Sequence, residues 1–408
     1  MTDHGRINST KMKWINTRNV LNTIRREVSI SRKDLSIKTG LTTGTITNIT
    51  AELLGKQYLI EVGNGESEGG RKPILLELDA NAGYAIGLEL QVTDIVCVIS
   101  DFKAQVLYSE RMSIDVADGK NVIIDQMIGL VEKVIREVRV EKEKILGLGL
   151  AIPGPCDYEK GIMINPPNFP GWINVPIKDI FEKRLGLQVY TSKETSCAVL
   201  SEYWFGKAAG NKRIFGIILG EVGIGGALVL DGEIFQEKEG ESMDIGHTIV
   251  QIDGHQCSCG NRGCLEVQAN GHAAVRYAQE SISNAEKCML KSPIEYANMI
   301  EKANAGEPAC VEAIKKCAFY ISVAVGNVLS LLSPQRMVFG GDFIEKCPML
   351  YDKIVEYIER RDYPASAKDA QKGKFSFGEK SGAMGGLALV FDAFSKSKFN
   401  IDFRITDK

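Results

Sequence analysis

The chain begins with three segments in which apolar residues recur at the spacing of an amphipathic helix. The pattern predicts a first helix over residues 16–26 and a third helix from Thr42 or Thr43 to about residue 54. Between them, Ser31 can cap a short second helix, which Gly40 ends because glycine tolerates a left-handed conformation. Helix, tight turn and helix is the order of a helix-turn-helix, whose second helix enters the major groove of DNA by its N-terminal end.

Two strand patterns follow, over residues 58–62 and 73–78, and a polar loop joins them. The pair predicts a β-wing with a basic tip, within reach of phosphates or of a narrow minor groove. A helical module that binds protein is the alternative for this segment, but the wing favours DNA. The residues expected to contact DNA are Ser31, Arg32, Thr43, Thr45, Asn48, Arg71 and Lys72. Among them Asn48 suits adenine, because an amide can pair bidentately with that base.

From residue 83 the pattern changes to strands that alternate with helices, which indicates an α/β protein. An amphipathic helix is expected over residues 121–140, a second over 194–205, mostly helices over 273–332, and a closing helix over 381–394. Strands are expected in the segments GYAIGLEL, TDIVCVISDF, QVLYSERMSI, ILGLGLAIPGP, FGIILGEVGIGGALVLDG and QRMVFGGDF.

Residues 246–266, GHTIVQIDGHQCSCGNRGCLE, concentrate side chains that bind metals. Cys257, Cys259 and Cys264, with His247 as a fourth ligand, suit a tetrahedral structural zinc site. His255 is an alternative to His247 that spacing alone does not exclude. Ordinary loop cysteines are the other interpretation, but C-x-C-x4-C is dense for a chain with 4 histidines.

The amino-acid composition indicates which class of protein this is. A hydrophobic content of 44% and a charged content of 25% are those of a soluble globular protein. Ten cysteines without an apolar N-terminal signal favour reduced thiols in the cytoplasm, and no membrane insertion is expected. Residues 1–72 hold twelve Lys or Arg and seven Asp or Glu, a net charge of +5, which leaves −8 for the remainder of a chain whose total is −3. This contrast suggests that only the N-terminal part meets nucleic acid.

Taken together, the motifs resemble those of the ROK family, named for repressor, open reading frame and kinase. The resemblance covers nearly the whole chain and rests on the GRKP wing, PPNFPGW, GIGGALVLDG, GH followed by CSCGNRGCLE, and FGGDF. It implies the actin-like, ribonuclease-H-like two-lobe ATPase fold of sugar kinases, with sugar and nucleotide in the cleft. Many members carry a winged helix and act as sugar-responsive transcriptional repressors.

The turns that bind ATP phosphates in the family's kinases are altered in this chain. The first reads Asp-x-Gly-Gly-Thr in kinases, whereas Gln91 and Val92 replace the two glycines here, and Val disfavours a positive φ. In the second turn Val222 replaces a Thr, and Glu221 adds a negative charge that would repel a triphosphate.

The catalytic Asp of the family corresponds to Glu194, which is one methylene longer, and a displacement of about 1 Å can cost about 100-fold in rate. No kinase activity is therefore expected, and an ATP-dependent sugar kinase that retains a DNA-binding domain is the alternative.

The resemblance also implies sugar contacts. The corresponding residues here are Asn168, Glu194, Asp244, His247 and Glu266. Asp244 stands where the family has Glu, and a capping or surface role is the alternative for a lone Asn or Asp. Glu266 is favoured because it closes the cysteine motif.

The sequence thus predicts a cytoplasmic repressor with a structural Zn²⁺. A winged helix-turn-helix is expected over residues 1–78, a small α/β lobe over 79–192 completed by 386–408, and a large lobe with the zinc loop over 193–385. The expected partners are double-stranded operator DNA, a sugar or sugar-phosphate effector and further copies of the chain, as dimer or tetramer on a palindromic operator. A docking protein in place of the sugar is a third alternative.

Overall fold

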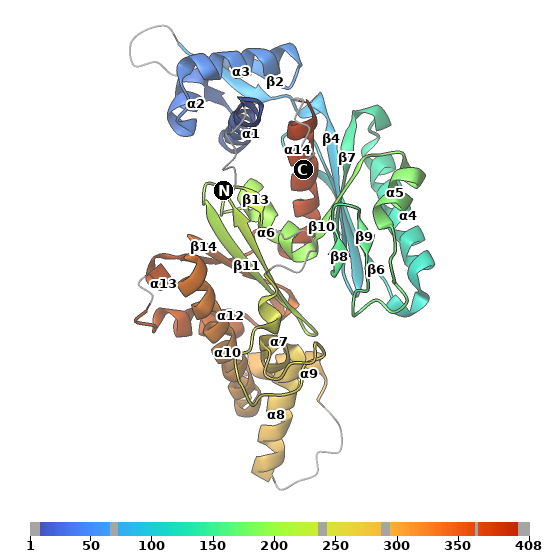
Figure 1. Ribbon diagram of the computed structural model, residues 1–408, viewed down its shortest axis with the longest axis vertical. Helices are drawn as coiled ribbons and strands as arrows, with labels where there is room; N and C mark the ends of the chain where they lie inside the picture. Colours follow the sequence, from blue (N-terminus) through green and yellow to red (C-terminus); the bar gives the residue numbers. More distant parts are fainter. Residues whose placement is uncertain (1–8, 66–71, 236–242, 287–293, 364–365, 399–408) are drawn as a thin grey trace, which may run out of the picture. The chain divides into compact units, whose positions relative to one another are not determined.

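The chain folds into two compact units in a computed structural model that describes residues 9–65, 72–235, 243–286, 294–363 and 366–398 (Figure 1). The first unit comprises Met1–Glu194 with Ala383–Lys408, and the second comprises Thr195–Gly382. The chain therefore leaves the first unit at the start of helix α6 (Glu194–Trp204) and returns in the first turn of helix α14 (Ser381–Lys398).

The first unit begins with three helices and a three-stranded antiparallel sheet of order β1-β3-β2. These elements over residues 9–78 are called the head below. Their bounds are α1 (Ser9–Glu27), β1 (Ile30–Ser31), α2 (Arg32–Thr39), α3 (Thr43–Gly55), β2 (Leu59–Asn64) and β3 (Ile74–Leu78). The arrangement has the predicted order of helix, turn, helix and hairpin, and adds the short strand β1, which pairs with β3.

Local hydrogen bonds explain where the helices of the head begin and end. Gly40 has φ 70°, and its N–H donates to the Ser36 carbonyl, which closes α2. The Thr42 hydroxyl accepts from the Thr45 N–H at 3.2 Å and so caps α3. The buried residues of α3 include Ile46, at helical spacing with the rest of its apolar face.

A five-stranded sheet of order β10-β7-β4-β5-β6 forms the rest of the first unit. Strands β4, β7 and β10 run parallel, whereas β5 and β6 are joined to β4 as an antiparallel meander. The bounds are β4 (Tyr84–Leu90), β5 (Asp94–Ser100), β6 (Val106–Ser113), β7 (Ile145–Ile152), β8 (Cys156–Asp157), β9 (Ile162–Met163) and β10 (Val189–Lys193), with helices α4 (Lys120–Val138) and α5 (Ile177–Leu185).

Two helices pack on opposite faces of this sheet. Ile86 and Leu88 of β4 share a buried apolar cluster with α4. Gly87 lies between them and therefore points to the other face. A Cβ on Gly87 would overlap the carbonyl oxygen of Ala383, and a Cβ on Gly149 would overlap that of Gly386. Helix α14 thus lies directly on β4 and β7 because both strands present glycine to it.

The second unit is built on a sheet of order β13-β12-β11-β14-β15 with helices around it. The strand bounds are β11 (Arg213–Leu219), β12 (Ile224–Leu230), β13 (Glu233–Ile234), β14 (Arg336–Gly340) and β15 (Gln371–Lys374). The helices after α6 are α7 (Leu265–Ala269), α8 (Gly271–Glu286), α9 (Tyr296–Asn304), α10 (Pro308–Leu332), α11 (Asp342–Lys346), α12 (Pro348–Glu359) and α13 (Ser366–Asp369). Apolar residues of β11, α8, α10 and α12 form one core.

Helix α10 is the one helix, among the residues that the structure describes, that is long and apolar enough to cross a membrane. However, 56% of its apolar window is buried inside the second unit, as expected for the central helix of a globular core.

Candidate metal centre and nucleic-acid interface

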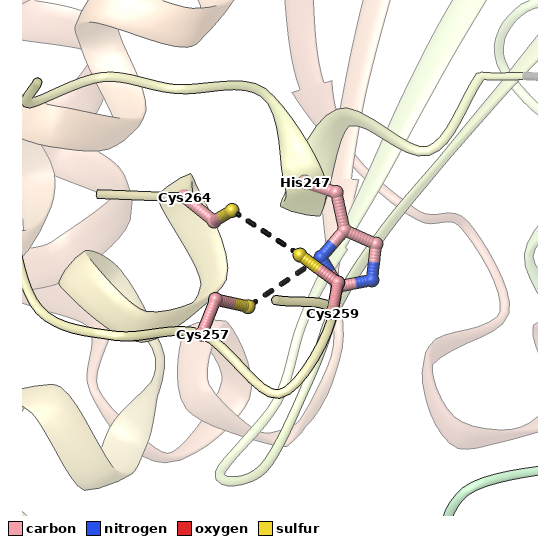
Figure 2. A group of neighbouring side chains, drawn as sticks. All are labelled: His247, Cys257, Cys259 and Cys264. Atoms are coloured by element: carbon pink, nitrogen blue, oxygen red, sulfur yellow. Dashed lines mark hydrogen bonds between the residues drawn. The ribbon is translucent and has the colours of Figure 1, made fainter. Parts of the chain in front are cut away.

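Four of the predicted metal ligands gather at one point of the second unit (Figure 2). The ligand atoms of His247, Cys257, Cys259 and Cys264 all lie within 4.8 Å of one another. Cys257 Sγ is 3.7 Å from His247 Nδ1, and Cys259 Sγ is 3.6 Å from Cys264 Sγ. Two sulfurs that each lie about 2.3 Å from a tetrahedral zinc are about 3.8 Å apart, so the cluster has the dimensions of a metal site.

Short-range structure brings these side chains together. His247 ends the 3₁₀ turn η4 (Ile245–His247), and Cys264 precedes α7 directly. Gly260 and Gly263 have φ values of 94° and 74°, which lets the cysteine loop turn back on itself. The Cys257 N–H donates to the Asn261 carbonyl at 2.8 Å and closes that turn.

The chemistry of the donors fits Zn²⁺. Burial raises the pKa of the Cys264 thiol to about 12, whereas a hydrogen bond from the Asn261 backbone lowers the pKa of Cys259. Three adjacent thiolates repel one another unless a cation lies among them. A set of three sulfurs and one imidazole nitrogen is a closed tetrahedral set of the kind that structural zinc uses. The cluster can therefore hold a metal ion.

His255, the alternative fourth ligand, is not part of the cluster. Burial, the cationic side chain of Arg276 and, more weakly, that of Lys316 lower the pKa of His255. The structure thus selects His247, which sequence spacing could not do.

The glycine turn between β11 and β12, residues 220–223, is held by side chains of the second unit. Glu266 Oε2 accepts from the Ile224 N–H at 3.2 Å, and Asn270 Nδ2 donates to the Val222 carbonyl at 2.6 Å. Both side chains lie a few residues after Cys264. The segment that follows the last cysteine of the cluster therefore also contacts the glycine turn.

The carboxylate of Asp342 also accepts a hydrogen bond from the glycine turn. Asp342 Oδ1 accepts from the Glu221 N–H at 3.1 Å, and Lys346 Nζ pairs with Asp342 Oδ2 at 3.1 Å. His272 Nε2 lies 3.6 Å from Glu221 Oε1. In this structure Asp342 therefore uses a backbone amide of the kind that cradles phosphate in a glycine turn. Sequence reasoning missed the roles of Asn270 and Asp342, although Asp342 lies in the quoted FGGDF motif.

The first altered phosphate turn is a tight hairpin bend between β4 and β5. The Gln91 N–H donates to the Asp94 carbonyl at 2.8 Å. Val92 does not have a positive φ, so this bend differs from the glycine turn of the kinases. Glu89 is buried, and its Oε2 accepts from the Ala383 N–H at 3.2 Å at the start of α14. Glu89 stands where the kinase phosphate turn Asp-x-Gly-Gly-Thr has its Asp, and in this protein its carboxylate caps a helix.

The five predicted sugar contacts are distributed over both units. Asn168 is exposed in the turn after β9, and Glu194 is the first residue of α6. Asp244 and His247 are exposed at η4, and Glu266 is half-buried on α7. A Cβ on Gly246 would lie 3.6 Å from that of Glu266, so η4 and α7 are neighbours.

The predicted DNA contacts differ in how accessible they are. Thr43 and Asn48 are exposed on α3, Thr45 is half-buried, Lys72 is exposed beside β3, and Arg71 lies outside the described residues. These positions agree with an α3 that presents its N-terminal half to a ligand.

Ser31 and Arg32 are engaged inside the head. Ser31 is buried, and its hydroxyl bonds to Asp34 at 2.7 Å. Arg32 Nε donates to Thr50 Oγ1 at 3.1 Å, and its Nη2 pairs with Glu61 at 3.1 Å. A contact of the Ser31 hydroxyl with DNA would compete with its bond to Asp34.

Comparison with known proteins gives a consistent result. The model of the ROK family matches residues 85–393. A xylose repressor of Caldicellulosiruptor bescii is 28% identical over 388 residues, which are 94% of this chain and 97% of that protein. A glucokinase of Halalkalibacterium halodurans is 26% identical and covers 75% of this chain. A solved ROK family transcriptional regulator, a homologue of the Escherichia coli Mlc protein, has a TM-score of 0.77 at 24% identity and covers 95% of this chain and 98% of that one.

Proposed function

Because the chain belongs to the ROK family, we propose that it is a DNA-binding transcriptional repressor of sugar-utilisation genes, controlled by a sugar or sugar derivative. The observation that carries the proposal is the extent of its similarity to a xylose repressor, which reaches 94% of this chain and so includes most of the head. The glucokinase similarity spans a smaller share, 75%. A cytoplasmic location is part of the same proposal.

The proposed DNA-binding domain is residues 1–78, a winged helix-turn-helix. Helix α3 would enter the major groove with Thr43, Thr45 and Asn48, while Arg71 and Lys72 of the wing contact the backbone or minor groove. A homodimer would place two such heads on a palindromic operator. The exposure of Thr43 and Asn48 supports this assignment.

His247, Cys257, Cys259 and Cys264 would hold the zinc ion, which supplies a structural cross-link and no reaction chemistry. The side chains next to the cluster position the glycine turn. Cys264 directly precedes α7, whose Glu266 accepts from the Ile224 N–H and so holds the glycine turn. The cluster would thereby keep Asp244, His247 and Glu266 in place for a ligand with several hydroxyl groups.

Selection of duplexes from a random library by the full-length, zinc-loaded protein tests this function. The expected result is enrichment of one sequence with two related half-sites, whose binding weakens as salt rises because phosphate contacts release counterions. Failure to enrich any duplex would overturn the proposal.

Glu266→Gln is expected to weaken sugar binding by about tenfold, because a hydrogen bond to a charged group contributes about 1.5–3 kcal/mol. The glutamine can still accept from Ile224, so the fold should be kept. Calorimetry over hexoses, pentoses and N-acetylated sugars measures the effect, with Glu301→Gln as a control on the exposed face of α9. Equal affinity of both variants would remove Glu266 from the site. Absence of any sugar binding by the unaltered protein would favour the alternative in which a partner protein supplies the signal.

No sugar-dependent ATP hydrolysis is expected in a coupled assay over the same sugars. Asp342 occupies the Glu221 amide, and Gln91 and Val92 replace the glycines of the first phosphate turn. Turnover that disappeared in a Glu194→Gln variant would instead establish the alternative, a sugar kinase that keeps a DNA-binding head.

A further inference from the structure

The head and the body of the first unit share an aromatic cluster. Tyr58 of the head stacks on Phe102 with ring centroids 5.6 Å apart and meets Phe394 edge-on at 5.1 Å. Phe102 lies in the turn between β5 and β6 and also contacts Phe391 of α14, at 5.9 Å. Phe102, Phe391 and Phe394 are buried. Such edge and stacked pairs stabilise a contact beyond the apolar area that they bury.

Two arginines of α1 also contact the body of the first unit, through an ion pair, a ring face and a hydrogen bond that each require a defined orientation of the helix. Arg18 Nη1 is 3.4 Å from Asp392 Oδ1, and the two side chains are only 8% and 18% exposed. The Arg25 guanidinium lies 4.7 Å from the Phe391 ring centroid and donates to the Phe102 carbonyl at 3.4 Å. Asp392 also pairs with Lys396 at 2.6 Å, so a shift of α1 would separate the Arg18 guanidinium from a carboxylate that is already held in place on α14.

The surface that receives the head is itself fixed to the sheet. Phe391 and Asp392 belong to α14, which contacts Gly87 and Gly149 without intervening side chains. Glu89 caps the first turn of the same helix.

The connection between head and sheet is also short and structured, since Asp79 Oδ1 accepts from the Asn81 N–H in the turn η1 (Ala80–Ala82).

We propose that Phe102, Phe391, Asp392 and Phe394 form a seat for the head, and that Arg18 and Arg25, by holding α1 on this seat, determine which spacing between operator half-sites the protein accepts. The inference rests on the proposed function. A dimer with freely rotating heads would accept several spacings, whereas seated heads match one, because each added base pair turns one half-site by about 34° relative to the other.

The test uses the full-length protein and the duplex selected from the random library. Duplexes with one to five base pairs inserted between the half-sites, and a duplex with a single half-site, are compared in competition binding. The unaltered protein is expected to lose at least about tenfold in affinity when five base pairs place the half-sites on opposite sides of the helix. The double variant Arg18→Ala, Arg25→Ala is expected to lose less than about threefold on the same insertion, while its affinity for the single half-site stays within about threefold.

Arg26→Ala is the control for the loss of an arginine from α1, because it removes one positive charge from the exposed side of the helix, where Arg26 bonds to Thr23. It should keep the spacing preference. Asp392→Asn is a milder variant of the seat for the case in which the double variant does not fold, as judged by circular dichroism and thermal unfolding, and it should broaden the accepted spacings in the same direction.

Three results would overturn the inference. The seat variants could keep the full spacing preference, they could lose single half-site affinity to the same extent as operator affinity, or the unaltered protein could accept all spacings. If the unaltered protein selected no duplex, the proposed function itself would fall.

Discussion

Replacing Cys257 by serine is expected to remove the metal from the purified protein and to destabilise the second unit. The four ligand atoms lie within 4.8 Å of one another, and a serine oxygen is a poor replacement for a thiolate ligand to zinc. Structural zinc contributes a large apparent free energy, about 10–16 kcal/mol in zinc-finger peptides at neutral pH. Metal analysis should therefore find one zinc per chain in the unaltered protein and none in the variant, together with a lower temperature of unfolding.

Cys310→Ser is the control for this experiment, because Cys310 is also buried in the second unit but belongs to α10 and not to the cluster. It should keep the metal. A second pair tests the choice of histidine, since His247→Ala should lose zinc and His255→Ala should retain it. Metal that survives Cys257→Ser, or that depends on His255 and not on His247, would contradict the assignment.

Loss of two exposed polar side chains of α3, those of Thr43 and Asn48, is expected to cause the largest drop in operator affinity. The double variant Thr43→Ala, Asn48→Ala removes candidate base contacts, and each good contact contributes about 1–3 kcal/mol of discrimination. The expected loss on the selected duplex is therefore about 100-fold or more, with little change on random DNA. Fluorescence anisotropy at a fixed salt concentration measures both.

Asn81→Ala is the matched control, because Asn81 is an exposed asparagine on η1. Lys72→Ala provides the contrast. It should weaken binding to all sequences and lower the salt dependence by about one unit, as expected for a phosphate contact. An Asn48 variant that weakened all duplexes equally would place this residue at the backbone and not at the bases.

The sequence was informative where local chemistry decides structure. Gly40, Thr42 and the apolar face of α3 predicted the bounds of α2 and α3, since caps and helical periodicity are short-range signals. Helix α1, however, begins at Ser9 and not at the predicted residue 16. Strand β1 was missed, because a two-residue strand has no periodicity and forms only when β3 is beside it.

Long-range partners could not be deduced from the sequence. The small residues of α14 were visible, but nothing in the sequence showed that Gly87 and Gly149 lie opposite them. Likewise, the carboxylate of Glu89 could be matched to a kinase Asp, yet its bond to the Ala383 N–H depends on residues almost 300 positions away along the chain. His247 was predicted as the fourth ligand, but excluding His255 required the folded loop, because spacing alone does not exclude it.

The position of α14 after the second unit in the chain has a consequence for synthesis on the ribosome. The sheet of the first unit is translated early, but the helix that covers its glycine face emerges only after the entire second unit. At about 5–20 residues per second, roughly 10–40 s pass between the two events. During that interval the nascent chain exposes an uncovered sheet, on which chaperones can act, and it has a head without Phe391, Asp392 and Phe394 to hold it. In the proposed repressor, premature termination before α14 would thus release a head whose orientation is not fixed, so recognition of a spaced operator would require that α14 has been translated.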